Sequence, residues 1–274
     1  MTAETTERIA QELTAAYAGR ESLAAPSQRD PGFDLAAGYA VEAELARRRR
    51  AAGRRTVGRK IGYANRALWR VFKLDTVGWA HMYDDTVHDA PSGTASLRIG
   101  GMTAPKLEPE IVFGLKHAPR GDPADPVAVL EAVEWLAPGF ELVDCVFPGW
   151  KFTPADFVAS FGLHAGLVVG PRLRVSGDQV PELAEQLGAL MVRLLKNGAL
   201  VAEGAGRNVL GNPALSLGEL ARGVARQPGA EPLAAGELIA TGALTDNQFI
   251  APGETWTAMM EGLPLADLTL HTTS

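Results

Sequence analysis

Apolar residues near the start of the chain recur at the spacing of a helix. Ile9, Leu13 and Tyr17 are four residues apart, so they share one face of a helix. A second helical pattern runs from about Asp34 to Arg50, after a loop rich in proline and aspartate. The two patterns predict an N-terminal helical accessory segment over residues 1–53.

From residue 54 the pattern changes to short β-rich runs separated by glycine and proline. Residues 54–274 are therefore predicted to form one α+β catalytic domain. The expected strands are 56–62, 105–113, 139–147, a hairpin of 190–195 with 199–201 turning at Asn197-Gly198, and 236–242. The expected helices are 125–133, 180–187 and one that begins at a capping box on Ser216.

The strand predicted over residues 105–113 carries two acids. Glu108 and Glu110 are two residues apart, so an extended strand places both carboxylates on one face. Pro105 and Pro109 lack backbone donors, which favours an edge strand or a strand that lines a cleft. Two neighbouring carboxylates repel each other unless a cation lies between them. They indicate either a metal site or the solvated face of an amphipathic strand.

Two further charged residues lie in apolar surroundings. Alternation in the 139–147 strand places Glu141 on one face with Val143 and Cys145. A buried carboxylate is costly without a cation, a base or a proton, so Glu141 needs a partner. Lys60 lies among apolar residues and small glycines, a context that indicates either an amine in a pocket or an ordinary surface lysine.

Two segments in the middle of the chain could border a site. The loop 148–156 carries Trp150 and Lys151 and could fold over a cleft. In the apolar, glycine-spaced run 161–170, His164 is the only ionisable residue, so this strand either passes close to a ligand or is tightly packed. A lone His81 is expected to be packed or hydrogen-bonded rather than a ligand.

Bulk properties exclude several classes of partner. The 274 residues carry a formal charge of −6 with a pI near 5.5, which argues against nucleic acid or an anionic membrane as partner. No apolar run reaches the ~18 residues that span a bilayer. One cysteine, Cys145, excludes an internal disulfide, and the first residues lack an export signal, so we expect a cytoplasmic protein.

Five short blocks, taken in order, resemble the fumarylacetoacetate hydrolase superfamily. Within it, the chain is most similar to the branch of 2-keto-4-pentenoate hydratases and 4-oxalocrotonate decarboxylases. The blocks are Gly58-Arg-Lys60-Ile-Gly62, Pro105-Lys-Leu-Glu108-Pro-Glu110, Phe140-Glu141-Leu-Val-Asp144, Gly211-Asn-Pro213 and Gly236-Glu-Leu-Ile-Ala-Thr-Gly242. The resemblance implies a mixed β-roll and homo-oligomers.

The resemblance also implies the chemistry of the site. It assigns Glu108, Glu110 and Glu141 as ligands of Mg²⁺ or Mn²⁺, Lys60 as an active-site lysine, and Thr241 as a residue near the substrate carboxylate. A 2-oxo acid substrate bound through the ion would pass through an enolate. Burial beside a metal is expected to lower the Lys60 pKa. We therefore predict a hydratase that adds water to a 2-hydroxydienoate or 2-oxo-enoate in aromatic catabolism.

Alternatives are a 2-oxo acid decarboxylase, an acylpyruvate-type C–C hydrolase in which His164 or His81 activates water, and a non-catalytic partner subunit. The run 159–164 and the segment 75–81 depart from the patterns usual in the hydratases. With Trp150, they suggest a bulkier or less polar substrate. His164 joins Lys60 as a candidate catalytic residue, and Lys151 and Phe161 join Thr241 as candidate substrate-binding residues.

Overall fold

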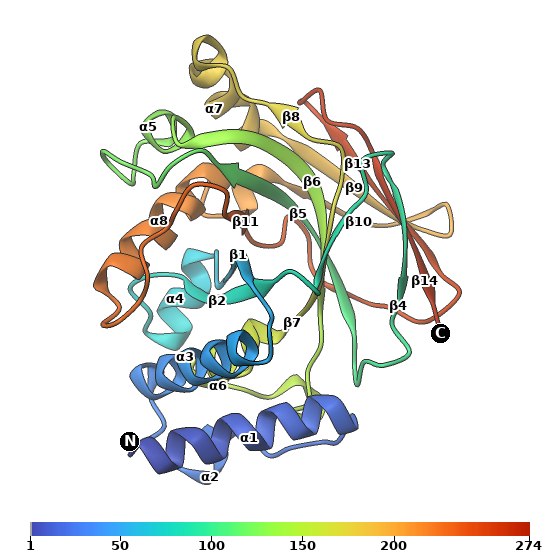
Figure 1. Cartoon of the computed structure of the whole chain (residues 1–274). Helices are drawn as coiled ribbons and strands as arrows, with labels where there is room; N and C mark the ends of the chain where they lie inside the picture. Colours follow the sequence, from blue (N-terminus) through green and yellow to red (C-terminus); the bar gives the residue numbers. More distant parts are fainter. Residues whose placement is uncertain (1) are drawn as a thin grey trace.

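A computed structural model describes residues 2–274 and shows two curved sheets with helices packed around them (Figure 1). The strands are β1 (Thr56–Gly62), β2 (Gly78–Tyr83), β3 (Val87–Asp89), β4 (Thr94–Arg98), β5 (Lys106–Leu115), β6 (Val133–Val143), β7 (His164–Val169), β8 (Leu173–Arg174), β9 (Met191–Lys196), β10 (Ala199–Ala205), β11 (Leu238–Ala240), β12 (Gln248–Phe249), β13 (Thr255–Glu261) and β14 (Leu268–Thr273). One sheet has the order β2-β1-β11-β5-β6-β7-β3, with β12 paired to β5 and β8 to β6. The other has the order β10-β9-β13-β14-β4. This mixed α+β architecture confirms the predicted fold class.

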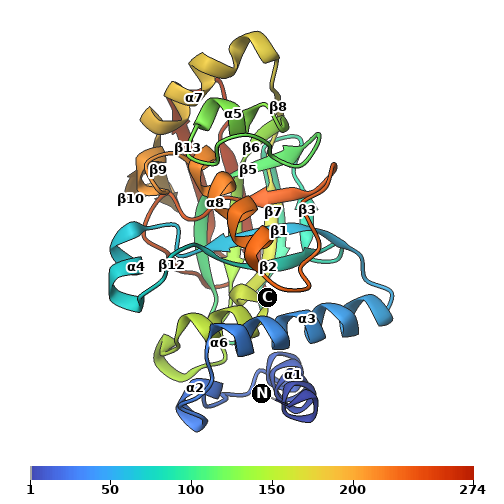
Figure 2. The same ribbon diagram turned by 90° about the vertical axis from the view of Figure 1, so that its left-hand side faces the viewer.

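The helices are α1 (Ala3–Gly19), α2 (Pro26–Arg29), α3 (Leu35–Ala51), α4 (Arg66–Phe72), α5 (Pro126–Leu130), α6 (Pro154–Ala159), α7 (Val180–Ala189) and α8 (Pro213–Arg226). The two predicted N-terminal helices form, because Thr2 and Asp34 each cap a helix with a side-chain oxygen. Both lie below the sheets with α6 (Figure 2). Their buried residues join the main hydrophobic core, and the division at residue 53 stays a prediction.

β5 and β6 form the centre of the larger sheet, and their register positions the acids. The two strands pair antiparallel along their length, with Glu108 opposite Glu141 and Glu110 opposite Gly139. The prediction of an edge strand is wrong, and the cleft-lining alternative is confirmed. β5 tolerates Pro109 because this residue falls between the stretches paired with β11 and β12, where its carbonyl accepts from the Leu244 N–H.

Three local predictions need correction. The helix expected to reach residue 133 ends at Leu130, and residues 133–138 already belong to β6, because they pair with β5. Ser216 does not start a helix: α8 begins after Asn212, whose side chain accepts from the Ala214 N–H. A short helix, α2, forms within the predicted loop. In the confirmed β9–β10 hairpin, Asn197 and Gly198 have φ of 50° and 83°.

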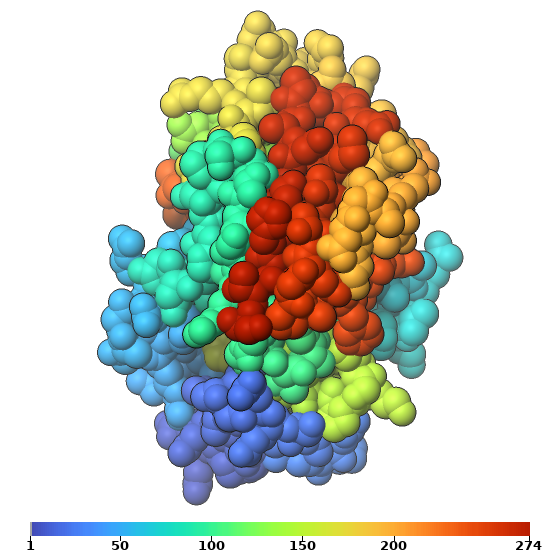
Figure 3. Space-filling view, turned by 90° about the vertical axis from the view of Figure 1, so that its right-hand side faces the viewer, coloured from blue at the N-terminus to red at the C-terminus, as the bar shows by residue number. Residues whose placement is uncertain are grey.

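The smaller sheet presents one face to the outside. Figure 3 shows β13 and β14 in red beside β4 in green, exposed over much of this side of the molecule. In β13 and β14, which pair antiparallel, residues alternate between buried and more exposed positions, the pattern of strands with one solvated face. Within residues 2–274, no helix has the length and apolar character needed to cross a bilayer.

Candidate metal centre and active site

Three glutamates converge on the inner face of the larger sheet. Glu108 and Glu110 come from β5, and Glu141 comes from β6 directly opposite Glu108. One carboxylate oxygen from each lies within 4.8 Å of the others. Glu110 and Glu141 are 0% exposed, and Glu108 is partly buried. The strand period of two and the β5–β6 register together bring three acids to one point.

The electrostatics of this cluster favour a bound cation. Burial, reinforced by the charges of Glu141 and Glu108, raises the pKa of Glu110 well above its usual range. Burial also raises the pKa of Glu108, and Lys60 only partly offsets the effect. Glu110 Oε1 is buried without a hydrogen-bond donor, while the Gly242 N–H donates to Glu110 Oε2 at 2.9 Å. Three converging carboxylates, one of them with an oxygen that no donor reaches, fit a hard divalent ion such as Mg²⁺ or Mn²⁺.

Lys60 extends from β1 into the same cluster. Its ammonium Nζ lies 2.8 Å from Glu141 Oε2, and the residue is 2% exposed, which removes the surface-lysine alternative. Burial acts to lower the Lys60 pKa, but the nearby carboxylates outweigh it, so the pKa is raised. The protein groups around Lys60 therefore shift its pKa upward, opposite to the predicted lowering. Gly162 makes room for the lysine, because a Cβ there would lie 2.6 Å from Lys60 Cδ.

His164 contacts Glu141 on the side away from Lys60. Its Nδ1 lies 2.9 Å from Glu141 Oε1, and its Nε2 lies 2.9 Å from Thr86 Oγ1. Burial acts to raise the pKa of Glu141, but Lys60 and His164 outweigh it, so this pKa is lowered. His164 does not line the main cavity, because its ring lies on the far side of Glu141 from Lys60. This geometry suits a residue that orients a metal ligand.

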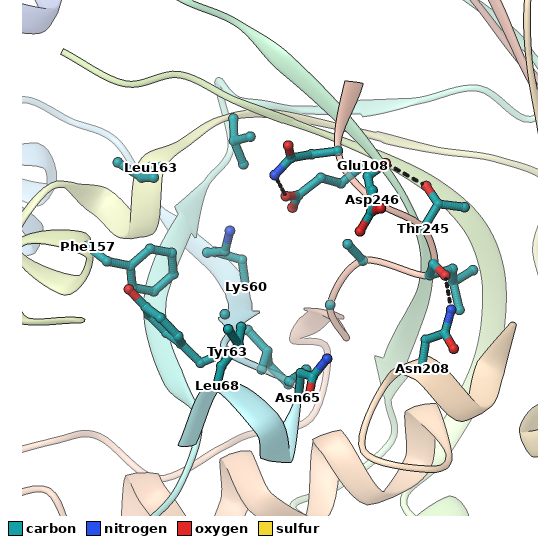
Figure 4. Close-up of a pocket in the computed structure, with 18 of the residues that line it drawn as sticks. Lys60, Tyr63, Asn65, Leu68, Glu108, Phe157, Leu163, Asn208, Thr245 and Asp246 are labelled. Carbon is teal, nitrogen blue, oxygen red and sulfur yellow. Dashed lines mark hydrogen bonds between the residues drawn. The ribbon is translucent and has the colours of Figure 1, made fainter. Parts of the chain in front are cut away.

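A cavity of about 450 Å³ opens beside Lys60 and Glu108. Figure 4 shows Tyr63, Leu68 and Phe157 on one side of it, and Asn208, Thr245 and Asp246 on the other. The Tyr63 hydroxyl is buried without a partner, and its φ of 58° places backbone strain next to the site. The cavity thus has an apolar wall, a polar wall and a charged inner end, which suits a small acid with an organic tail.

The other predicted site residues do not line this cavity. Thr241 is buried, and its hydroxyl donates to the Ile111 carbonyl at 2.9 Å. Phe161 packs edge-to-face on Tyr17 and borders a separate cavity. Lys151 is exposed on the loop after Trp150 and is not part of the lining, whereas Trp150 is. The predicted substrate-binding roles of these three residues remain predictions.

Sequence reasoning missed most of the polar wall. Asn208, Thr245, Asp246 and Asn247 line the cavity, and the Asn247 amide donates to Glu108 Oε1 at 3.2 Å. The available signal was the polar run Thr245-Asp246-Asn247, which directly follows the strand that ends near Thr241. Polar side chains in a loop that directly follows such a strand often contact ligands.

Comparison with known proteins places this site in a family, although no model of a known protein family matches the chain. A 2-hydroxyhexa-2,4-dienoate hydratase from Comamonas testosteroni is 28% identical over 257 residues, covering 94% of each chain. A 4-oxalocrotonate decarboxylase from Pseudomonas sp. (strain CF600) is 30% identical and covers 85% of this chain and 84% of its own length. The chain belongs to the hydratase and decarboxylase branch of the fumarylacetoacetate hydrolase superfamily.

Solved structures agree with membership of this branch. The 4-oxalocrotonate decarboxylase from Pseudomonas putida G7, complexed with magnesium and adipate, matches with a TM-score of 0.88 and 26% identity. The match covers 99% of this chain and 98% of the other. A fumarylpyruvate hydrolase from Pseudomonas aeruginosa, in complex with Mn²⁺ and pyruvate, has a TM-score of 0.57 at 15% identity. It covers 78% of this chain and 88% of its own, and shares the fold.

Proposed function

We propose that this family member is a divalent-metal-dependent hydratase that adds water to a 2-hydroxydienoate or 2-oxo-enoate in the breakdown of aromatic compounds. The observation that carries the proposal is the convergence of Glu108, Glu110 and Glu141 with Lys60 at the inner end of one cavity. The hydratases and decarboxylases among its relatives support the same class of reaction.

The residues of the site have two roles, which are to bind the metal ion and to transfer a proton. The three glutamates would hold Mg²⁺ or Mn²⁺, which when bound supplies a Lewis acid for the 2-oxo acid head of the substrate. Lys60 carries a proton, because the carboxylates around it raise its pKa. It is therefore suited to donate that proton to C3 or to the C2 oxygen. The Phe157 ring centroid, 5.2 Å from the Lys60 Nζ, shields the ammonium from water.

The charge of the lining favours a substrate with an uncharged tail. Apart from Lys60, the cavity is lined by the acidic residues Glu108, Glu203 and Asp246, and no further lysine or arginine lines it among the residues that the structure describes. A second substrate carboxylate would meet repulsion there. Hydration of a substrate with one carboxylate therefore fits better than decarboxylation of a dicarboxylate.

Decarboxylation is the second candidate function. The structural similarity to the decarboxylase complexed with adipate, a dicarboxylate, favours it. Lys106 also lies near the mouth of the cavity, with its Nζ 4.0 Å from the ring centroid of Trp150 and 4.6 Å from that of Phe249. If this cation reached a distal carboxylate, it would offset the acidic lining.

The test is turnover by the purified chain with Mg²⁺ or Mn²⁺. We expect it to consume 2-hydroxypenta-2,4-dienoate and yield a 4-hydroxy-2-oxo acid, followed by ultraviolet absorbance and NMR. Release of CO₂ from an unsaturated 2-oxo diacid at a higher kcat/KM would assign the decarboxylase instead. Tight metal binding without turnover of either substrate would assign a non-catalytic partner subunit.

Two further properties belong to this proposal. We also propose a cytoplasmic location, because the single cysteine of the sequence suits a reducing compartment. A homo-oligomer is expected from the resemblance, and light scattering of the purified chain would measure its mass. A monomer at micromolar concentration would contradict that expectation.

A further inference from the structure

Asp246 is the one cavity carboxylate that has no partner among residues 2–274. Glu108 accepts from Asn247, and Glu203 lies 3.6 Å from Arg193. No hydrogen bond or ion pair engages the Asp246 carboxylate within the described chain, and Figure 4 shows this side chain directed into the cavity from the polar wall. The residue is exposed, so water reaches it at the mouth.

The segment that carries Asp246 is held at both ends. The Leu244 N–H donates to the Pro109 carbonyl at 2.9 Å, and Asn208 donates to the Leu244 carbonyl at 2.8 Å. On the other side, Gln248 pairs with Leu107 at the start of β12. The Asp246 carbonyl also accepts from the Thr245 hydroxyl. These contacts fix the backbone of Asp246 relative to the metal-binding strand, as a positioned acid–base group requires.

The two ends of the cavity differ in access to water. Lys60, Glu110 and Glu141 are at most 2% exposed, so the inner end is dry. Water addition needs a water molecule at the distal carbon of the double bond, away from the 2-oxo acid head, together with a base that takes its proton. Of the groups that line the cavity, Asp246 alone combines a carboxylate without a partner, a fixed backbone and access to water.

We propose that Asp246 is the general base that activates the water added by this enzyme, an inference that rests on the proposed hydratase function. The Asp246 carboxylate takes one proton from water as the water oxygen bonds to C4 of a 2-oxo-3-enoate. The C3=C4 electron pair moves toward the C2 carbonyl, and C3 receives a proton from the Lys60 ammonium. Solvent then removes the proton from Asp246 and returns one to Lys60, so the net change is the addition of one water molecule.

The experiment separates water addition from chemistry at the 2-oxo acid head. Hydration of 2-hydroxypenta-2,4-dienoate is measured in the wild type and in Asp246→Asn, which keeps the shape of the side chain. Exchange of the C3 hydrogens of 2-oxopentanoate in D₂O, monitored by NMR, reports enolisation of the 2-oxo acid group. This saturated acid has no double bond to hydrate. Mn²⁺ affinity is measured by calorimetry. Asp267→Asn removes the same charge at an exposed position between β13 and β14 and is the control.

We expect Asp246→Asn to lower kcat for hydration by about 100-fold or more, the low end for loss of a general base, with C3 exchange and Mn²⁺ affinity within about twofold of the wild type. Asp267→Asn should match the wild type throughout. Hydration by Asp246→Asn within twofold of the wild type would overturn the assignment. Parallel loss of exchange and Mn²⁺ binding would also overturn it, by placing Asp246 in the metal site. A wild type that catalyses neither reaction would instead refute the proposed function on which the assignment rests.

Discussion

Two buried histidine–glutamate pairs in this chain have nearly the same local geometry but different surroundings. His164 Nδ1 lies 2.9 Å from Glu141 Oε1, and His81 Nδ1 lies 2.7 Å from Glu42 Oε1. Two more carboxylates and Lys60 surround Glu141, and the buried Glu110 Oε1 has no donor. A histidine–glutamate contact does not by itself make a catalytic site; here, the convergence of three carboxylates distinguishes the metal centre.

The His81–Glu42 pair lies on the opposite face of β1 and β2. Arg59, the register partner of His81, alternates with Lys60 along β1, so its side chain points away from the glutamate cluster. Arg59 Nε lies 3.8 Å from Glu237 Oε2, and neither His81 nor Glu42 lines the main cavity. The C–C hydrolase alternative, which needs histidine-activated water at the substrate, thus lacks support from either histidine.

Matched substitutions of the two glutamates should give the largest difference. Glu141→Gln removes a metal ligand and the partner of Lys60. It should therefore lower Mg²⁺ affinity by more than the roughly 10- to 100-fold typical of residues that only support a ligand. Glu42→Gln should leave metal affinity and kcat/KM within about twofold. Calorimetry and steady-state assays on both variants check this, and equal losses in the two would remove the distinction between the pairs.

Substitution of Lys60 should separate chemistry from metal binding. Lys60→Met keeps the length of the side chain without its proton, so kcat should fall roughly 10²- to 10⁴-fold, the range for general acid–base groups. Mg²⁺ affinity should not weaken, because the ammonium competes with the ion for Glu141. Steady-state kinetics at saturating metal measure the first effect and calorimetry the second. An unchanged kcat would return Lys60 to a structural role.

Substitutions of the two histidines should give the smallest difference in Mg²⁺ affinity. His164→Asn removes the group that orients Glu141, so Mg²⁺ affinity should fall roughly 10- to 100-fold while kcat at saturating metal changes less. His81→Asn should leave Mg²⁺ affinity within twofold and act only on the free energy of unfolding, measured by urea denaturation. A kcat that falls for His164→Asn at saturating metal as far as for Lys60→Met would give His164 a direct part in the reaction.

Local sequence patterns singled out the acids of the metal centre, and the family resemblance assigned them as ligands, but neither predicted their contacts. The period of two placed Glu108 with Glu110, and Glu141 on an apolar face, without any knowledge of pairing. The register that sets Glu108 opposite Glu141 joins residues far apart in the chain, so no local pattern contains it. For the same reason Pro109 was consistent with an edge strand, although the sheet accommodates it at its centre between two short partner strands.

The directions of side chains in loops and at strand ends also could not be predicted from the sequence. The sequence showed that His164 is the only ionisable residue of its strand. The fold shows that it contacts Glu141 and does not line the main cavity. Thr241 lies beside the site, with its hydroxyl turned to the Ile111 carbonyl. Asp246 belongs to a loop with no periodicity, and anchoring contacts to Pro109 and Asn208 bring it to the cavity.

The most direct test of the metal centre is a calorimetric Mn²⁺ titration of the wild type and Glu110→Gln across pH. Because burial and neighbouring carboxylates raise the pKa of Glu110, this group takes up a proton at a higher pH than an ordinary glutamate. The wild type should bind one ion per chain, with an affinity that falls as pH drops, beginning above the usual glutamate range. Glu110→Gln should bind no ion at this site. Wild-type affinity in Glu110→Gln, or an affinity independent of pH down to about 4.3, the ordinary glutamate pKa, would contradict the account.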